Sequence, residues 1–158
     1  MRRLEQYVEI GVMNVIVQNL TAAAFQPYGT VIQFDEAKAE GFQVIVEEPE
    51  AEGWRIAISQ LTRGKIVKLG LHPNTRESFE PLSGISLILV AKKEAPQELE
   101  VFLLDQPVCL HKNIWHATAA LSSRSLIKIT ENNHVESMEY VLDAPLDFCV
   151  KPEAYCYE

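Results

Sequence analysis

The sequence has 158 residues, which is the length of one ordinary globular domain. Its composition, 47% hydrophobic and 23% charged, is typical of a soluble folded protein and excludes an intrinsically disordered chain. The formal net charge of −8 argues against a nucleic-acid partner, because binding to phosphate backbones requires a basic face. No apolar run is long enough to span a bilayer, and the first residues lack the apolar core of a secretory signal. We therefore expect one domain over residues 1–158, located in the cytoplasm and without a membrane partner.

The number and spacing of the cysteines argue against a small protein held together by disulfides. Cys109, Cys149 and Cys156 are an odd number and show no C-x-x-C spacing. A fully paired disulfide framework is thereby excluded, and a zinc-thiolate site is disfavoured. We expect three reduced thiols, with Cys109 buried.

In chain order, the sequence predicts short strands separated by turn residues. Thr21 is placed to cap one helical turn that ends at Phe25, ahead of the breaking segment Pro27-Tyr28-Gly29. Apolar or alternating patterns predict strands over residues 13–18, 30–34, 42–46, 54–61, 65–71, 85–91, 99–104, 108–110 and 125–130.

The patterns after residue 84 also indicate how the strands are buried and connected. The run 85–91 is apolar throughout, which is typical of a strand buried on both faces. The charged stretch 92–98 then predicts a hairpin loop, and from about residue 144 to 158 the pattern gives way to a tail. Many short strands with almost no helical periodicity indicate an all-β sandwich or barrel.

Side chains able to carry chemistry gather in two short segments. The first contains His72 and Glu77, and the second, residues 111–116, contains His111 and His116. Imidazoles and a carboxylate on adjacent strands can converge inside a barrel, because inward-facing positions alternate along each strand. Two histidines and one carboxylate leave open positions on a divalent metal ion, where substrate or water can bind.

The first segment resembles the first cupin motif, which reads glycine, five residues, H-x-H, four residues, glutamate, six residues, glycine. Four positions are in register, namely Gly64, His72, Glu77 and Gly84, whereas the first histidine of the pair is replaced by Gly70.

The second segment is similar to the second cupin motif, whose last ligand histidine corresponds to His116. The usual glycines of that motif are here Asp105 and Asn113, the residue types that best tolerate a positive φ after glycine. We therefore expect both turns to be kept.

Among cupins, the chain resembles the ureidoglycolate lyase family. The family pattern H-P-x-x-x-Q-x-F-x-P-x-x-G has glutamine where this chain has Glu77, and it is otherwise matched by His72, Pro73, Phe79, Pro81 and Gly84. The family pattern H-x-x-x-W-H is matched by His111, Trp115 and His116. The segment 20–29 also looks like the opening segment of the family.

The resemblance implies an all-β cupin fold, a double-stranded β-helix (jelly-roll barrel) with minor helical turns. It also implies a lyase that breaks a C–N bond of ureidoglycolate to give glyoxylate and urea, in purine and allantoin nitrogen catabolism. A divalent metal ion would be held by His72, Glu77 and His116, and His111 would transfer protons, since its unperturbed pKa is near neutrality. Three further residues would line the substrate pocket or pack behind it: Phe79, Lys112 and Trp115.

The chain also departs from the family, which keeps two alternatives open. The family's Asp-Arg at the end of a later strand is replaced within residues 129–133, and arginine is the side chain that grips carboxylates bidentately. This loss and Gly70 favour a non-catalytic small-molecule-binding cupin, whereas the carboxylate of Glu77 favours another metal-dependent cupin enzyme, an isomerase or oxygenase. In either case we expect a homodimer that pairs through sheet edges.

Overall fold

The computed structural model describes residues 15–38 and 41–148. The elements along the chain are β1 (Val17–Gln18), α1 (Ala22–Phe25), β2 (Gly29–Val31), β3 (Arg55–Thr62), β4 (Lys65–Leu71), β5 (Glu77–Ser83), β6 (Ser86–Ala91), β7 (Glu100–Leu103), β8 (Val108–Leu110), β9 (Trp115–Ala120), β10 (Arg124–Glu131) and β11 (Met138–Asp147). The predicted helical turn is confirmed, because Thr21 Oγ1 accepts a hydrogen bond from the Ala24 amide at 3.2 Å. No helix in the described ranges is long and apolar enough to cross a membrane.

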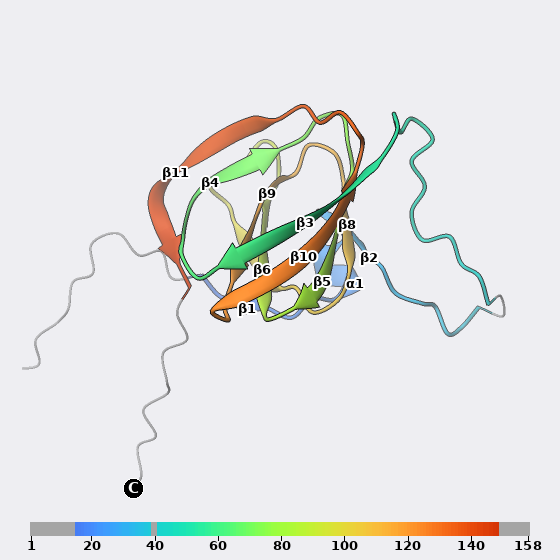
Figure 1. Ribbon diagram of the computed structural model, residues 1–158, viewed down its shortest axis with the longest axis horizontal. Helices are drawn as coiled ribbons and strands as arrows, with labels where there is room; N and C mark the ends of the chain where they lie inside the picture. The colour runs from blue at the N-terminus through green and yellow to red at the C-terminus, as the bar shows by residue number, and fades with distance from the viewer. Residues whose placement is uncertain (1–14, 39–40, 149–158) are drawn as a thin grey trace, which may run out of the picture.

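The strands form two sheets that enclose the interior of the barrel (Figure 1). The six-stranded sheet has the order β1-β7-β6-β9-β4-β11, and the five-stranded sheet has the order β2-β8-β5-β10-β3. Apart from the parallel contact of β1 with β7, neighbouring strands pair antiparallel.

The order of pairing identifies the topology. β6 and β7 form a hairpin, and outward from it β5 pairs with β8, β4 with β9 and β3 with β10. Successive pairs fall in alternate sheets, so the chain is a long hairpin folded over into a jelly roll. The predicted all-β jelly-roll fold is confirmed.

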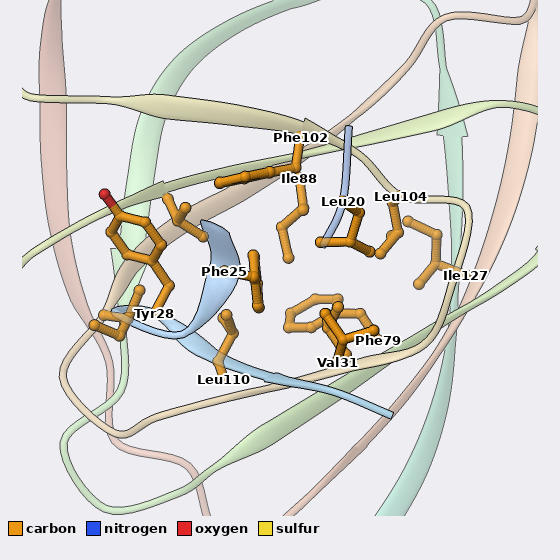
Figure 2. Packing of buried hydrophobic residues seen from close by; sticks show 13 residues of the cluster. Leu20, Phe25, Tyr28, Val31, Phe79, Ile88, Phe102, Leu104, Leu110 and Ile127 are labelled. Carbon is orange, nitrogen blue, oxygen red and sulfur yellow. The ribbon is translucent and has the colours of Figure 1, made fainter. Parts of the chain in front are cut away.

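The core between the sheets is aliphatic and aromatic (Figure 2). Phe25 of α1 is fully buried in it and meets Phe102 edge-on, with ring centroids 5.3 Å apart. Along β6, Ile88 and Val90 belong to this core, whereas Leu87 and Leu89 belong to a second cluster on the other face of the six-stranded sheet. The prediction that this strand is buried on both faces is confirmed, and the two layers fix the sheet that carries part of the functional site.

Of the two strands predicted between β2 and β4, one is wrong and one is confirmed. Residues 42–46 form no strand, although all of them except Gln43 are apolar. Phe42 and Val44 are 85% and 59% exposed, and the side chain of Gln43 bonds to both backbone groups of Asp35 instead of joining a ladder. The predicted strand 54–61 exists as β3, but Ile56 and Ile58 point outward and are more than half exposed.

Three strands escaped prediction, namely β5, β9 and β11. Pro81 in β5 and Pro145 in β11 lack the N–H that a ladder needs, which disfavours a strand in the sequence. Each proline lies where the register of its strand shifts, so the irregularity accommodates the missing donor. β11 therefore continues to Asp147, past the predicted start of the tail, and residues 149–158 lie outside the described ranges.

Candidate metal centre

Three of the predicted residues converge between the two sheets: His72, Glu77 and His116, called here the interior cluster. His72 follows the last residue of β4, His116 lies in β9, and Glu77 begins β5 in the opposite sheet. One oxygen of Glu77, Oε2, lies 2.7 Å from His116 Nε2 and 3.4 Å from His72 Nε2. The potential ligand atoms of the three residues all lie within 4.8 Å of one another, a spacing that a single ion can bridge.

Backbone carbonyls orient both imidazoles. His72 Nδ1 lies 2.9 Å from the carbonyl oxygen of Glu136, and His116 Nδ1 lies 3.0 Å from that of Ile114. A carbonyl can only accept, so each Nδ1 donates and each Nε2 is directed at Glu77. This is the second-layer arrangement that metal-ligating histidines use in proteins, because it fixes the tautomer and the ring plane.

The carbonyl that orients His72 is itself held in place by Asn74. The Asn74 side chain accepts a hydrogen bond from the amide of Glu136 at 2.9 Å and donates one to the carbonyl of His134 at 3.0 Å. Asn132, which is buried, donates back to the carbonyl of Asn74 at 3.0 Å. The turn after His72 and the segment 132–137 are thus joined, a relation between distant residues that the sequence pattern did not reveal.

The turn before His116 also reaches His72. Asn113 adopts φ 64°, as expected for a residue standing at a glycine position, and its amide donates to the carbonyl of His72 at 3.0 Å. Asp105, the other residue at a glycine position, does not have a positive φ. One of the two expected turns is therefore confirmed in its conformation, and it links the two motifs directly.

The charges in the interior cluster are strongly coupled. Burial alone would raise the pKa of Glu77, but the hydrogen bond and the charge of His116 outweigh burial and hold that pKa well below its usual range. Burial lowers the pKa of His116, and the Glu77 carboxylate more than compensates, so the net pKa is raised. Without an ion, a proton on His116 therefore occupies the place where a cation would neutralise Glu77.

A second carboxyl group, not predicted from the sequence, adjoins the cluster. Glu131, the last residue of β10, has the same inward phase as Ile127 and Ile129 and forms a side-chain hydrogen bond with Glu77. Burial and this hydrogen bond raise the pKa of Glu131, while Arg55 opposes the rise. Arg55 Nε and a terminal guanidinium nitrogen both bond to Glu131 Oε1, at 2.8 and 2.7 Å. Alternation along β10 was the available signal, since it places residue 131 on the inner face.

The donor set of the interior cluster fits a divalent first-row metal ion. Two neutral imidazole nitrogens and a carboxylate oxygen suit zinc, iron or manganese and leave coordination positions open. At Gly70, where the first cupin histidine would stand, a Cβ atom would meet no other atom within 4 Å. Gly70 pairs directly with His116, so the space for a missing ligand lies beside the cluster.

The predicted pocket residues Phe79 and Trp115 lie on opposite faces. Phe79 faces the interior, where its ring packs edge-on against His116 with centroids 5.6 Å apart. Trp115 lies in the cluster on the outer face of the six-stranded sheet, packs against Tyr140 and donates from its indole N–H to the carbonyl of Lys93. The structure thus places Trp115 in the core rather than in the pocket.

His111 and Lys112 lie apart from the interior cluster. Arg76 donates to His111 Nδ1 at 3.1 Å, and His111 Nε2 lies 3.3 Å from the carbonyl of Gln26. Lys112 Nζ lies 3.2 Å from Glu48 Oε2, which also accepts from Arg76 Nε at 3.1 Å. The proton-transfer role of His111 stays a prediction, because both of its ring nitrogens are engaged with groups outside the cluster.

Comparison with known proteins places the chain in a family. No protein-family model matches it. A ureidoglycolate lyase from Rhizobium etli is 31% identical over 121 residues, covering 63% of this chain and 72% of that enzyme. A ureidoglycolate lyase from Agrobacterium fabrum is 33% identical with the same coverage. The chain belongs to the ureidoglycolate lyase family. Within the pattern of the ureidoglycolate lyase family, Glu77 supplies a carboxylate at the position of a neutral glutamine.

Solved structures with a related chain path are more distant. A dTDP sugar isomerase from Desulfovibrio desulfuricans is 16% identical with a TM-score of 0.49, over 74% of this chain and 84% of that one. An oxalate decarboxylase from Bacillus subtilis is 15% identical with a TM-score of 0.43, over 55% of this chain and 24% of that one. Neither likeness is close enough to bear on the chemistry of this member of the ureidoglycolate lyase family.

Proposed function

We propose that this protein is a metal-dependent C–N lyase that cleaves ureidoglycolate to glyoxylate and urea. Membership of the ureidoglycolate lyase family supports the substrate. The observation that carries the metal dependence is the convergence of His72 Nε2 and His116 Nε2 on one oxygen of Glu77, at 3.4 and 2.7 Å. Both imidazoles are oriented by backbone carbonyls in the manner of ligands.

The substrate is a hemiaminal, so its cleavage needs proton movements at two atoms. A base removes the hydroxyl proton, the C–N bond breaks as the carbonyl of glyoxylate forms, and an acid protonates the departing urea nitrogen. His72, Glu77 and His116 would hold the metal ion, which would act as a Lewis acid that lowers the pKa of the substrate hydroxyl. Phe79, packed against His116, limits the pocket on the apolar side and keeps that imidazole in place.

We assign the proton transfer to Glu131. Its raised pKa brings the carboxyl group closer to neutrality, where one group can both accept and donate a proton during a turnover. Arg55 fixes the carboxyl group through Oε1, and the same carboxyl group interacts with Glu77. His111 is the alternative, and it would first have to give up its bond to Arg76 or to Gln26.

The alternative of a non-catalytic binding cupin is favoured by one observation. Gly70 leaves the interior cluster one histidine short of the cupin pattern, and nothing fills the space within 4 Å of a Cβ there. In that function the cluster would bind a small molecule without turnover.

A turnover assay separates these functions. Purified protein is supplied with a divalent metal ion and ureidoglycolate, and glyoxylate and urea are measured in equal amounts. The proposal expects turnover that a chelator removes and the metal ion restores, that is reduced by orders of magnitude in His116→Ala, and that is unchanged in His134→Ala, a histidine outside the cluster. Metal-loaded protein that binds ureidoglycolate without releasing products would identify a non-catalytic binding cupin.

A further inference from the structure

A second concentration of charged side chains lies on the outer face of the five-stranded sheet. It consists of Glu48, Arg76, His111 and Lys112, called here the outer cluster. Arg76 immediately precedes Glu77, and since neighbouring residues of an extended chain point to opposite sides, Arg76 is directed away from the barrel interior. Its guanidinium bonds to His111 and Glu48, and within the described ranges it bonds to no member of the interior cluster.

Two members of the outer cluster, Glu48 and Arg76, line a cavity of about 260 Å³. The floor is formed by cross-strand neighbours on β5, β8 and β10, namely Ser78, Cys109 and Thr130, and it ends at Glu131 and Asn132. The roof is formed by the connection between β2 and β3, which swings out on the side of the barrel where β2 and β8 lie (Figure 1). The residues that this connection contributes to the lining of the cavity are mostly apolar: Ile32, Val46, Ala51 and Trp54.

Two cations, Arg76 in the lining of this cavity and Lys112 beside it, share a single carboxylate oxygen of Glu48. Arg76 Nε and Lys112 Nζ lie 3.1 and 3.2 Å from Oε2 of Glu48, and their side chains are 31% and 26% exposed. Lys112 contributes most to lowering the pKa of Glu48, so this carboxyl group is ionised at neutral pH. Arg76 and Lys112 thus face Glu48 as two positive charges to one, and the other carboxyl group of the lining, Glu131, is paired with Arg55, on a protein whose net charge is −8.

We propose that this cavity is a binding site for a small organic carboxylate, and that the Glu48 carboxylate occupies the place of the ligand's carboxylate. Arg76 offers a planar set of donors that suits a carboxylate, and Lys112 adds a point charge. The apolar roof would cover the body of the ligand. The volume is somewhat below that of pockets for drug-sized molecules, about 300–1,000 Å³, so the ligand is a molecule of a few heavy atoms.

Displacing Glu48 is energetically feasible. Ion pairs that remain partly exposed to water contribute little to stability, because solvent screens them. Glu48 also belongs to the stretch 32–54, whose described residues form no helix or strand, and connections of this length are commonly functional. An external carboxylate therefore competes with a tethered one, and we expect a Kd on the order of millimolar.

The test is a ¹⁵N–¹H chemical-shift titration of the purified chain with butyrate, which carries one carboxylate on a short apolar body. The matched control ligand is butylammonium, which has a similar body and the opposite charge, and sodium chloride is the control for ionic strength. We expect saturable shifts at the amides of Ser78, Cys109 and Thr130 with butyrate alone. Shifts confined to the neighbours of His116, equal shifts with butylammonium, or shifts that chloride reproduces would each overturn the proposal.

Variants test the role of Glu48 in the same titration. Glu48→Gln removes the competing charge, so the Kd for butyrate should fall about fivefold or more. Glu52→Gln, which removes a carboxylate from the same connection but not from the lining of the cavity, should leave the Kd unchanged. Lys112→Met should raise the Kd about fivefold or more, since it removes one of the two cations. An unchanged or higher Kd for butyrate in Glu48→Gln would contradict the proposal. This outcome does not depend on bound metal or on turnover.

Discussion

Gly70 and His116 lie directly opposite each other in the antiparallel pair of β4 and β9. Residues so paired project to the same face, and the face at this position is the one on which His116 meets Glu77. A Cβ at Gly70 would meet no atom within 4 Å, and the φ of this glycine is not positive. The chain therefore keeps room for the histidine that cupins have at this position.

Replacing Gly70 with histidine should add a ligand to the metal centre. A further imidazole beside His116 would raise the affinity for a divalent ion by about tenfold or more, which corresponds to about 1.4 kcal/mol. The control is Gly70→Ala, which should leave metal affinity unchanged and stabilise the protein by about 0.5 kcal/mol, because glycine in a strand costs conformational entropy. Competition titrations with a chromogenic chelator measure the affinities. An equal effect of both substitutions would show that position 70 does not face the centre.

Glu77→Gln should weaken metal binding while leaving the fold intact. The amide keeps the shape of the side chain but loses the negative charge, and neutral amides are poor ligands for divalent cations. The loss of affinity should grow as the pH falls, because protons compete with the metal for His72 and His116. Chelator titrations at two pH values compare wild type with this variant and with Glu80→Gln, a carboxylate of β5 that pairs with Lys128 outside the cluster. Coinciding curves for all three proteins would place Glu77 outside the ligand set.

The stability of the metal-free protein should depend on pH through His116. Its pKa is raised in the folded state above the unfolded value of about 6.5, because Glu77 favours the imidazolium. The stabilisation is therefore fully present below about pH 6.5 and is lost as the pH rises through the folded pKa. Urea unfolding in the presence of a chelator should show a falling free energy of unfolding above about pH 6.5. In His116→Gln this fall should be much smaller, and an identical pH profile would contradict the ion pair.

Kinetics should distinguish Glu131 from His111 as the proton-transfer residue. Glu131→Gln keeps the shape of the side chain beside Arg55 and Glu77, but the amide cannot transfer a proton. We therefore expect kcat to fall by about 10²–10⁴, with little change in metal content. His111→Asn should lower kcat by much less, because the His111 ring bonds to Arg76 and Gln26. Steady-state rates with ureidoglycolate and metal analysis of each variant are the measurements. A large loss in His111→Asn with normal Glu131→Gln would restore the role first expected for His111.

The sequence predicted the architecture better than the details of its strands. Motif register identified the jelly roll and brought His72, Glu77 and His116 to one place, because spacing along strands determines which side chains face inward. It failed where tertiary context decides: Phe42 and Val44 find no neighbouring strand, and Pro81 and Pro145 sit within strands at shifts of register. The neighbours of the interior cluster could not be predicted from the sequence either, because Arg55 and Glu131 come together only where β3 pairs with β10. The homodimer remains a prediction.

The most direct test of the metal centre is the metal content of the purified protein and of the double variant His72→Ala with His116→Ala. The control is the double variant His111→Ala with His134→Ala, which removes the same number of imidazoles from outside the interior cluster. Each protein is loaded with a divalent ion, freed of excess and measured by elemental analysis, and its fold is checked by circular dichroism. We predict about one ion per chain in the wild type and the control, and none in the folded His72→Ala/His116→Ala variant. Equal metal content in all three proteins, or no bound metal in the wild type, would contradict the account.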